Sequence, residues 1–321
     1  SVSNGVERRA IGNFRKGPGS GYRGDLSSIL DNSALNARNF SLTGQNTPKA
    51  AYNHLRFGVT LGGPLSIPHL FRSNNGNFFI AYQMTRNRNA NNQSTLMPTA
   101  PARSGDLTGV LNAQGQPVTV IDPTNGLPFP GNVIPETRIS PQAKALLNFY
   151  PLPNFDPTAR YNYQVALVGV TDQDAVQTRI NKMINPRNFV NGTFAFQRVD
   201  TASPNLFSFR DNNHNLGLNT NVSWRHTFSK MVNGNLTANF SRLSVRNTPY
   251  FADRINVSGE AGITGNNQDA VNWGPPNLNF GSGFAGLNDS QYSFVRNQSR
   301  ALNYTMLWMK RPHNFTFGGD I

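Results

Sequence analysis

Few residues in this sequence have the types and spacing that chemistry would need. Asp172 and Asp174 are the closest carboxylates, and on a strand their spacing places both on one face, as in paired acid–base catalysis. No base follows them at a useful spacing. Residues 281–286 (GSGFAG) match G-x-G-x-x-G, but the flanking strand and helix that dinucleotide binding requires are missing from the pattern. We therefore expect a protein that is not an enzyme.

Metal-ligand patterns are equally sparse. The chain has no Cys, and its five His lack the paired spacing of a zinc site. Residues 211–215 (DNNHN) offer oxygen ligands without the spacing or the final Glu of an EF-hand loop. The sequence predicts no cofactor, and calcium in a surface loop is the alternative.

The formal net charge is +13, which raises the question of a nucleic-acid partner. The basic residues are scattered between Asn-rich stretches, whereas binding to phosphates needs them clustered on one face. Charged residues make up only 14% of the chain, and 44 Asn supply much of its polarity. We expect no nucleic-acid partner.

The strongest signal is the alternation of apolar and polar residues over four stretches, at 190–197, 218–228, 232–241 and 302–309. In the second stretch Leu218, Val222 and Trp224 face one way, and Asn219, Asn221 and Ser223 face the other. None of the four apolar faces carries Lys, Arg, Asp or Glu. A basic residue facing lipid at mid-depth costs about 2–4 kcal/mol. The pattern predicts membrane strands with a lipid face and a hydrated lumenal face.

Connection lengths support the same interpretation. Weaker alternation at 55–65, 77–85, 174–184 and 313–321 adds four strands, and the links between strands are short and long in turn. That order is typical of periplasmic turns and extracellular loops. We predict an all-β, antiparallel transmembrane β-barrel, partial, with about eight strands. Residues 1–50 would lead into it and residues 51–321 would form its first part, with long extracellular loops at about 86–173 and 246–297.

Two local features belong to the long loops. Eleven prolines lie between Pro98 and Pro157, which predicts a stiff, largely extended segment that caps one end. A short helix is expected over residues 141–149 (PQAKALLNF), with Ser140 as its N-cap and Pro141 at its first position.

Two groups of aromatic residues are the candidate site residues. Trp224, Phe228, Tyr304 and Trp308 stand on the apolar faces and are expected to form a girdle at the membrane interface. The second group lies in the last long loop, where its members either contact a ligand or pack the loop: Phe251, Trp273, Phe280, Phe284 and Tyr292.

Several strings resemble one family in order along the chain. They are residues 33–44 (SALNARNFSLTG), 56–68 (RFGVTLGGPLSIP), 77–82 (NFFIAY), 97–107 (MPTAPARSGDL), 121–135 (IDPTNGLPFPGNVIP), 150–154 (YPLPN) and 307–321 (LWMKRPHNFTFGGDI). These are similar to the start of the barrel in Oar-like TonB-dependent receptors of the acidobacterial type, which carry a carboxypeptidase-regulatory-like domain. The resemblance covers residues 31–321, and no plug or TonB box is recognisable.

The resemblance implies an outer-membrane receptor that takes up or translocates a bulky, unidentified ligand. It implies outer-membrane lipid as surroundings, and a TonB energy-transducing complex reached through N-terminal parts that precede these residues. Two alternatives stay open: a secreted or surface β-sandwich adhesin that binds glycans, and a passive porin-like channel.

Overall fold

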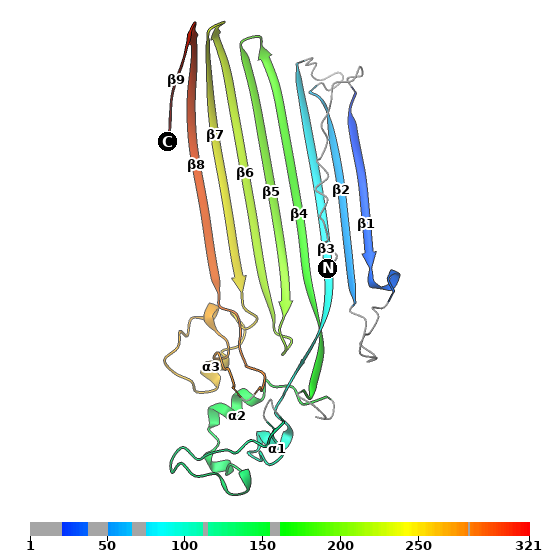
Figure 1. Ribbon diagram of the computed structural model, residues 1–321, viewed down its shortest axis with the longest axis vertical. Helices are drawn as coiled ribbons and strands as arrows, with labels where there is room; N and C mark the ends of the chain where they lie inside the picture. The colour runs from blue at the N-terminus through cyan, green and yellow to red at the C-terminus, as the bar shows by residue number, and fades with distance from the viewer. Residues whose placement is uncertain (1–20, 38–50, 66–74, 112–114, 155–160, 282) are drawn as a thin grey trace.

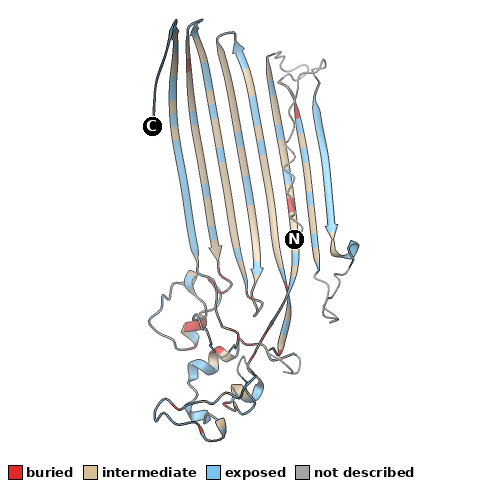
Figure 2. Ribbon diagram, in the orientation of Figure 1, coloured by how far each residue is buried: buried red, intermediate tan, exposed pale blue. Residues whose placement is uncertain are grey.

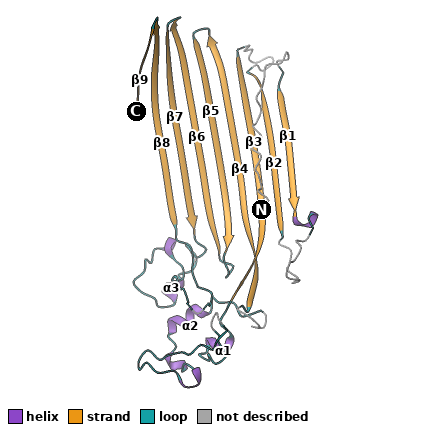
Figure 3. Cartoon of the chain, in the orientation of Figure 1, coloured by secondary structure: helices purple, strands orange, loops and turns teal. Residues whose placement is uncertain are grey.

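Nine antiparallel strands form one sheet in a computed structural model that describes residues 21–37, 51–65, 75–111, 115–154, 161–281 and 283–321. The strands are long and stand side by side in chain order (Figures 1 and 3). They are β1 (Arg23–Asn32), β2 (Tyr52–Pro64), β3 (Gly76–Thr95), β4 (Tyr163–Asn185), β5 (Asn188–Pro204), β6 (Arg210–Ser229), β7 (Val232–Thr248), β8 (Ser293–Lys310) and β9 (His313–Asp320). The sheet is open, with β1 and β9 at its edges.

The helices are short and gather at one end of the sheet, apart from η1 beside the end of β1 (Figure 3). They are α1 (Ala100–Arg103), α2 (Pro141–Leu147), α3 (Val257–Glu260) and the 3-10 turns η1 (Ser33–Leu35), η2 (Pro130–Asn132), η3 (Glu136–Arg138) and η4 (Ala270–Asn272). None of the helices in the described ranges is long and apolar enough to cross a membrane.

The expected alternation of short and long links is confirmed. Two-residue turns join β4 to β5, β6 to β7 and β8 to β9 at one end, while residues 96–162 and 249–292 join strands at the other. The loops are shorter than predicted because β3, β4, β7 and β8 continue past the apolar band. Backbone pairing between β3 and β4 continues to Thr95 and Tyr163, and ion pairs such as Arg86 with Asp174 join side chains of the two strands there.

The strand count differs from the prediction by one. β1 lies inside the segment expected to lead into the barrel, and it pairs with β2 over its whole length. Its alternation is hidden because Ile29 lies on the face with Asp25 and Asp31, while Ser28 lies among the apolar positions. Of the predicted lead-in segment, residues 1–20 and 38–50 lie outside the described residues.

The long loops fold together into a cap with its own core, and most of the buried residues among those described lie there (Figure 2). The cap draws on three connections, at residues 96–162, 205–209 and 249–292. Its buried apolar residues are Met97, Leu146, Tyr150, Phe209, Phe251, Val257, Ala261, Ala285 and Leu287. The prediction of a largely extended segment is therefore wrong, whereas its role in capping one end of the sheet is confirmed.

Specific hydrogen bonds close this cap. The amide of Asn162 is 1% exposed and bonds both backbone groups of Met97, at 2.7 and 2.8 Å. The Tyr150 hydroxyl donates to the Ala285 carbonyl at 3.0 Å, and burial raises the pKa of that hydroxyl to about 12. The predicted helix is confirmed as α2, where the Ser140 hydroxyl accepts from the Ala143 amide.

Candidate functional site

Register sorts the side chains of the sheet onto two faces. Trp224 pairs with Val190 on β5 and with Leu236 on β7, and Leu236 pairs in turn with Tyr304 on β8. Directly paired residues of an antiparallel sheet share a face. The four apolar stretches found in the sequence therefore lie on one face, and their Asn, Ser and Thr residues lie on the other.

The apolar face is free of charge across the middle of the sheet. From Val232 to Ala238 on β7, and at the paired positions of β5, β6 and β8, it carries no Lys, Arg, Asp or Glu. Its side chains remain open to the surroundings, as with Val222 at 45% exposed. An exposed apolar sheet face without charge is what contact with lipid requires.

The predicted girdle residues lie on this face near the short turns. Tyr304 and Phe228 border Gly234, where an added Cβ would lie 2.9 Å from the Tyr304 hydroxyl and 3.0 Å from the Phe228 ring. Trp308 stacks obliquely with Phe315 on β9 at 5.4 Å, and the Trp224 indole donates to Asn188 beside the turn. They stand at two levels, because Trp308 is paired with Val232 next to the turn whereas Trp224 and Tyr304 flank Leu236 four residues further along β7. Their place at a membrane interface stays a prediction.

The opposite face is a hydrogen-bonded surface of uncharged polar side chains. Asn221 donates to Asn239 at 2.5 Å, Ser223 donates to Asn235 at 2.9 Å and Thr227 donates to Asn233 at 2.9 Å. Ser241 and Ser299 share a hydrogen bond of 2.7 Å. Such side chains would be expensive in lipid and are satisfied by one another and by water in a lumen.

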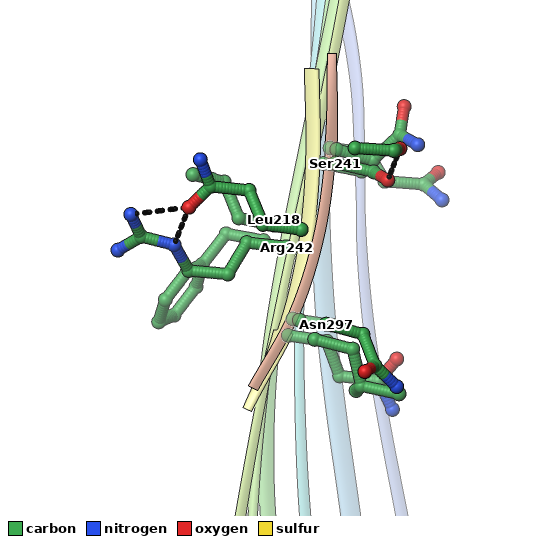
Figure 4. Close-up of a pocket in the computed structure, with 14 residues that line it drawn as sticks. Leu218, Ser241, Arg242 and Asn297 are labelled. Carbon is green, nitrogen blue, oxygen red and sulfur yellow. Dashed lines mark hydrogen bonds between the residues drawn. The ribbon is translucent and has the colours of Figure 1, made fainter. Parts of the chain in front are cut away.

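A depression of about 460 Å³ lies across β4 to β8. Most of its lining comes from two neighbouring rows of the polar face, and small residues (Ala175, Ala195, Gly217) leave the room. Figure 4 shows Ser241 and Asn297 on one side of the strands and Leu218 and Arg242 on the other. The amide and hydroxyl groups that line the depression can both donate and accept hydrogen bonds, and they do not favour a charged ligand over a neutral one.

The pair Asp172 and Asp174 lies on one face of β4, as the sequence indicated. Each carboxylate is bound by an arginine of β3, Asp174 by Arg86 at 2.9 Å and Asp172 by Arg88 at 2.6 Å. The two carboxylates are thus held in ion pairs. They lie beyond the apolar band, where charged residues again occur on this face of the sheet.

The loop aromatics differ in how far they are buried. Phe251 is 1% exposed in the core of the cap, so the structure assigns it to packing and removes it from the ligand-contact candidates. The Trp273 indole is bonded within its own loop to the Gln268 carbonyl, and Phe284 forms a bridge with Leu96 at the end of β3. Phe280 is 45% exposed and Tyr292 is half-buried.

The calcium alternative treats residues 211–215 as part of a surface loop, but these residues belong to β6 and point to alternate faces of the sheet. No group of three or more His, Asp or Glu able to hold a metal ion occurs in the part of the chain that the structure describes.

The cap contains a carboxyl group with a shifted pKa that the sequence did not predict. Burial, and then the neighbouring Asp211 carboxyl, raise the pKa of Asp289 to about 7. A contact between residues this distant in sequence leaves no local signal.

This shifted group makes the stability of the cap depend on pH. The ordinary pKa is 3.8, so between about pH 4 and pH 7 the folded cap keeps a proton that the unfolded loop has lost. Stability of the cap should therefore fall as pH rises through that window and level off above it. Hydrogen exchange of residues 249–292 should show this fall in the wild type and a flatter profile in Asp289→Asn. A wild-type profile that rises with pH would contradict the assignment.

The sheet has one apolar and one polar face, short turns at one end and long loops that form a cap at the other. These features define a β-sheet membrane protein. A family model described as the outer membrane beta-barrel domain matches residues 16–321. The chain belongs to this family, and the outer membrane is its location. No match was found among curated proteins or among solved structures.

Proposed function

We propose that this barrel domain belongs to a TonB-dependent receptor of the Oar-like kind, which takes up or translocates a bulky ligand across the outer membrane. The resemblance of residues 56–68 and 121–135 to that family supports the receptor over other outer-membrane barrels. The secreted β-sandwich alternative loses support, since the described strands form one sheet and no second sheet packs on it.

The observation that carries the proposal is the hydrogen-bonded polar face beneath a folded cap. Asn, Ser and Thr exchange hydrogen bonds with water, with a plug or with a passing ligand, and they impose no ion pairs that would hold it. In this proposal the cap meets ligands on the outer side, supported by the exposure of Phe280 at 45% and the half-buried position of Tyr292. Transport of this kind involves no covalent chemistry and draws its energy from the TonB complex.

Two measurements on the full-length protein test the receptor against the porin-like channel. A TonB-dependent receptor should bind the periplasmic domain of TonB in detergent and should show little steady conductance in a planar bilayer. A passive channel should give steady conductance and bind no TonB. A protein that conducts freely without binding TonB would overturn the proposal and leave the barrel assignment intact.

A further inference from the structure

Four arginines stand together on the lipid-facing side of the sheet near the cap. Arg242 and Arg246 lie on β7, and Arg296 and Arg300 lie on the adjacent strand β8. Register places Arg300 opposite Phe240 and Arg246 opposite Phe294, so all four project from the same face as Leu236 and Tyr304. We call these four residues the arginine surface.

The guanidinium groups of the arginine surface are ordered in pairs over aromatic rings. Arg242 and Arg300 lie 5.8 and 6.0 Å from the centre of the Phe240 ring. Arg246 and Arg296 lie 5.0 and 5.3 Å from the centre of the Phe294 ring. A ring contact orients a guanidinium group while leaving its charge in place.

Three other arginines on the same face have acidic partners. Arg86 pairs with Asp174, Arg88 with Asp172, and Arg198 with Asp200 at 2.7 Å. Within the described ranges, no ion pair joins a carboxylate to any member of the arginine surface. Positive charge is therefore balanced over β3 to β5 and concentrated over β7 and β8.

The distance of these arginines from the short turns, measured along the membrane normal, places their charge at the outer edge of the apolar band. Arg242 and Arg246 lie ten and fourteen residues beyond Val232 on β7. At about 3.3 Å per residue and a tilt near 45°, they stand about 23 and 33 Å above it, against an apolar band about 25 Å tall. Arg300 lies one row lower than Arg242, and its long side chain reaches toward the interface. Long loops mark the extracellular side, so the nearest lipid is that of the outer leaflet.

We propose that the arginine surface binds the phosphate groups of an anionic lipid of the outer leaflet, the phosphorylated glycolipid lipid A. Guanidinium groups bind phosphate oxygens through paired hydrogen bonds, and acyl chains would then lie along the uncharged face below. The lipid would anchor the two strands that carry the second long loop of the cap. This inference depends on the outer-membrane family and on the lipid-facing side of the sheet, and it is independent of TonB.

Binding of lipid A to the full-length protein in a neutral detergent tests the proposal. Two double variants remove one pair each, Arg242→Gln with Arg300→Gln and Arg246→Gln with Arg296→Gln. Each arginine near an anionic surface changes affinity about 5-fold, so each double variant should bind about 25-fold more weakly. The matched control is Arg225→Gln, which removes an arginine held over Phe189 at 5.2 Å on the lumenal face. Its affinity should equal that of the wild type.

Three further measurements complete the test. Dephosphorylated lipid A should bind weakly to every form of the protein, and inorganic phosphate should not compete at similar concentrations. Binding by the wild type should weaken as salt rises, a result that holds even if a double variant fails to fold. Unchanged affinity in folded double variants, equal binding of the dephosphorylated lipid, or full competition by inorganic phosphate would overturn the proposal.

Discussion

Arginine placed at Val222 or Leu236 is expected to block assembly of the barrel, whereas arginine at Asn221 or Asn235 should be tolerated. Leu236 lies in the same row as Trp224 and Tyr304, and Val222 lies one row further from the short turns; both stand on the uncharged face, on the turn side of the arginine surface. A guanidinium group facing lipid there costs about 2–4 kcal/mol, which is a large part of the small net free energy of unfolding of a folded protein. The measurement is the amount of heat-modifiable protein recovered from outer membranes.

The two Asn variants are matched controls, because each differs from its partner by one position and places the same side chain on the opposite face. Asn221→Arg gives up its hydrogen bond to Asn239, so a small loss is expected. Equal recovery of all four variants would refute the assignment of faces.

Phe251→Ala should unfold the cap and leave the sheet intact. The Phe251 ring is 1% exposed and packs edge-on against Phe209 at 4.6 Å, Tyr250 at 5.0 Å and Phe149 at 5.8 Å. Removing a buried Phe side chain costs about 3–5 kcal/mol, which is large for a core of this size. Limited proteolysis should cut within residues 96–162 and 249–292 much faster than in the wild type.

The control for this variant is Phe280→Ala in the same loop. Phe280 is 45% exposed, so its removal should leave proteolysis close to the wild-type rate. If Phe251→Ala retains wild-type resistance, or if both variants become sensitive to the same degree, the cap does not depend on the core described here.

The faces of the central strands could be predicted from sequence because membrane strands obey a strict rule over many residues. Lipid excludes charge from one face, so the alternation from Leu218 to Phe228 could be recognised without knowing its neighbours. Beyond the apolar band, lipid no longer excludes charged residues from that face. Arg86 and Asp174 then interrupt the apolar pattern, and for that reason the sequence predicts loops where the strands in fact continue.

The cap and the depression depend on contacts between distant parts of the chain. Met97 and Asn162 meet across a long loop, and neither has a local pattern that indicates burial. In the depression, the combination of Ala175, Ala195 and Gly217 depends on the register of three strands, which turn geometry fixes. Sequence therefore predicted the polar character of the lumenal face and missed the shape of its surface.

The two-faced sheet is the central claim, and spin-label accessibility along β6 measures it directly. The 321 residues contain no Cys, so single Cys residues can be introduced in this chain one position at a time from Leu218 to Trp224. Labels at Leu218, Thr220, Val222 and Trp224 should meet lipid-soluble oxygen, and labels at Asn219, Asn221 and Ser223 should meet a water-soluble nickel complex. An accessibility profile with a period of two supports the account. A flat profile, or one with the two faces exchanged, would contradict it.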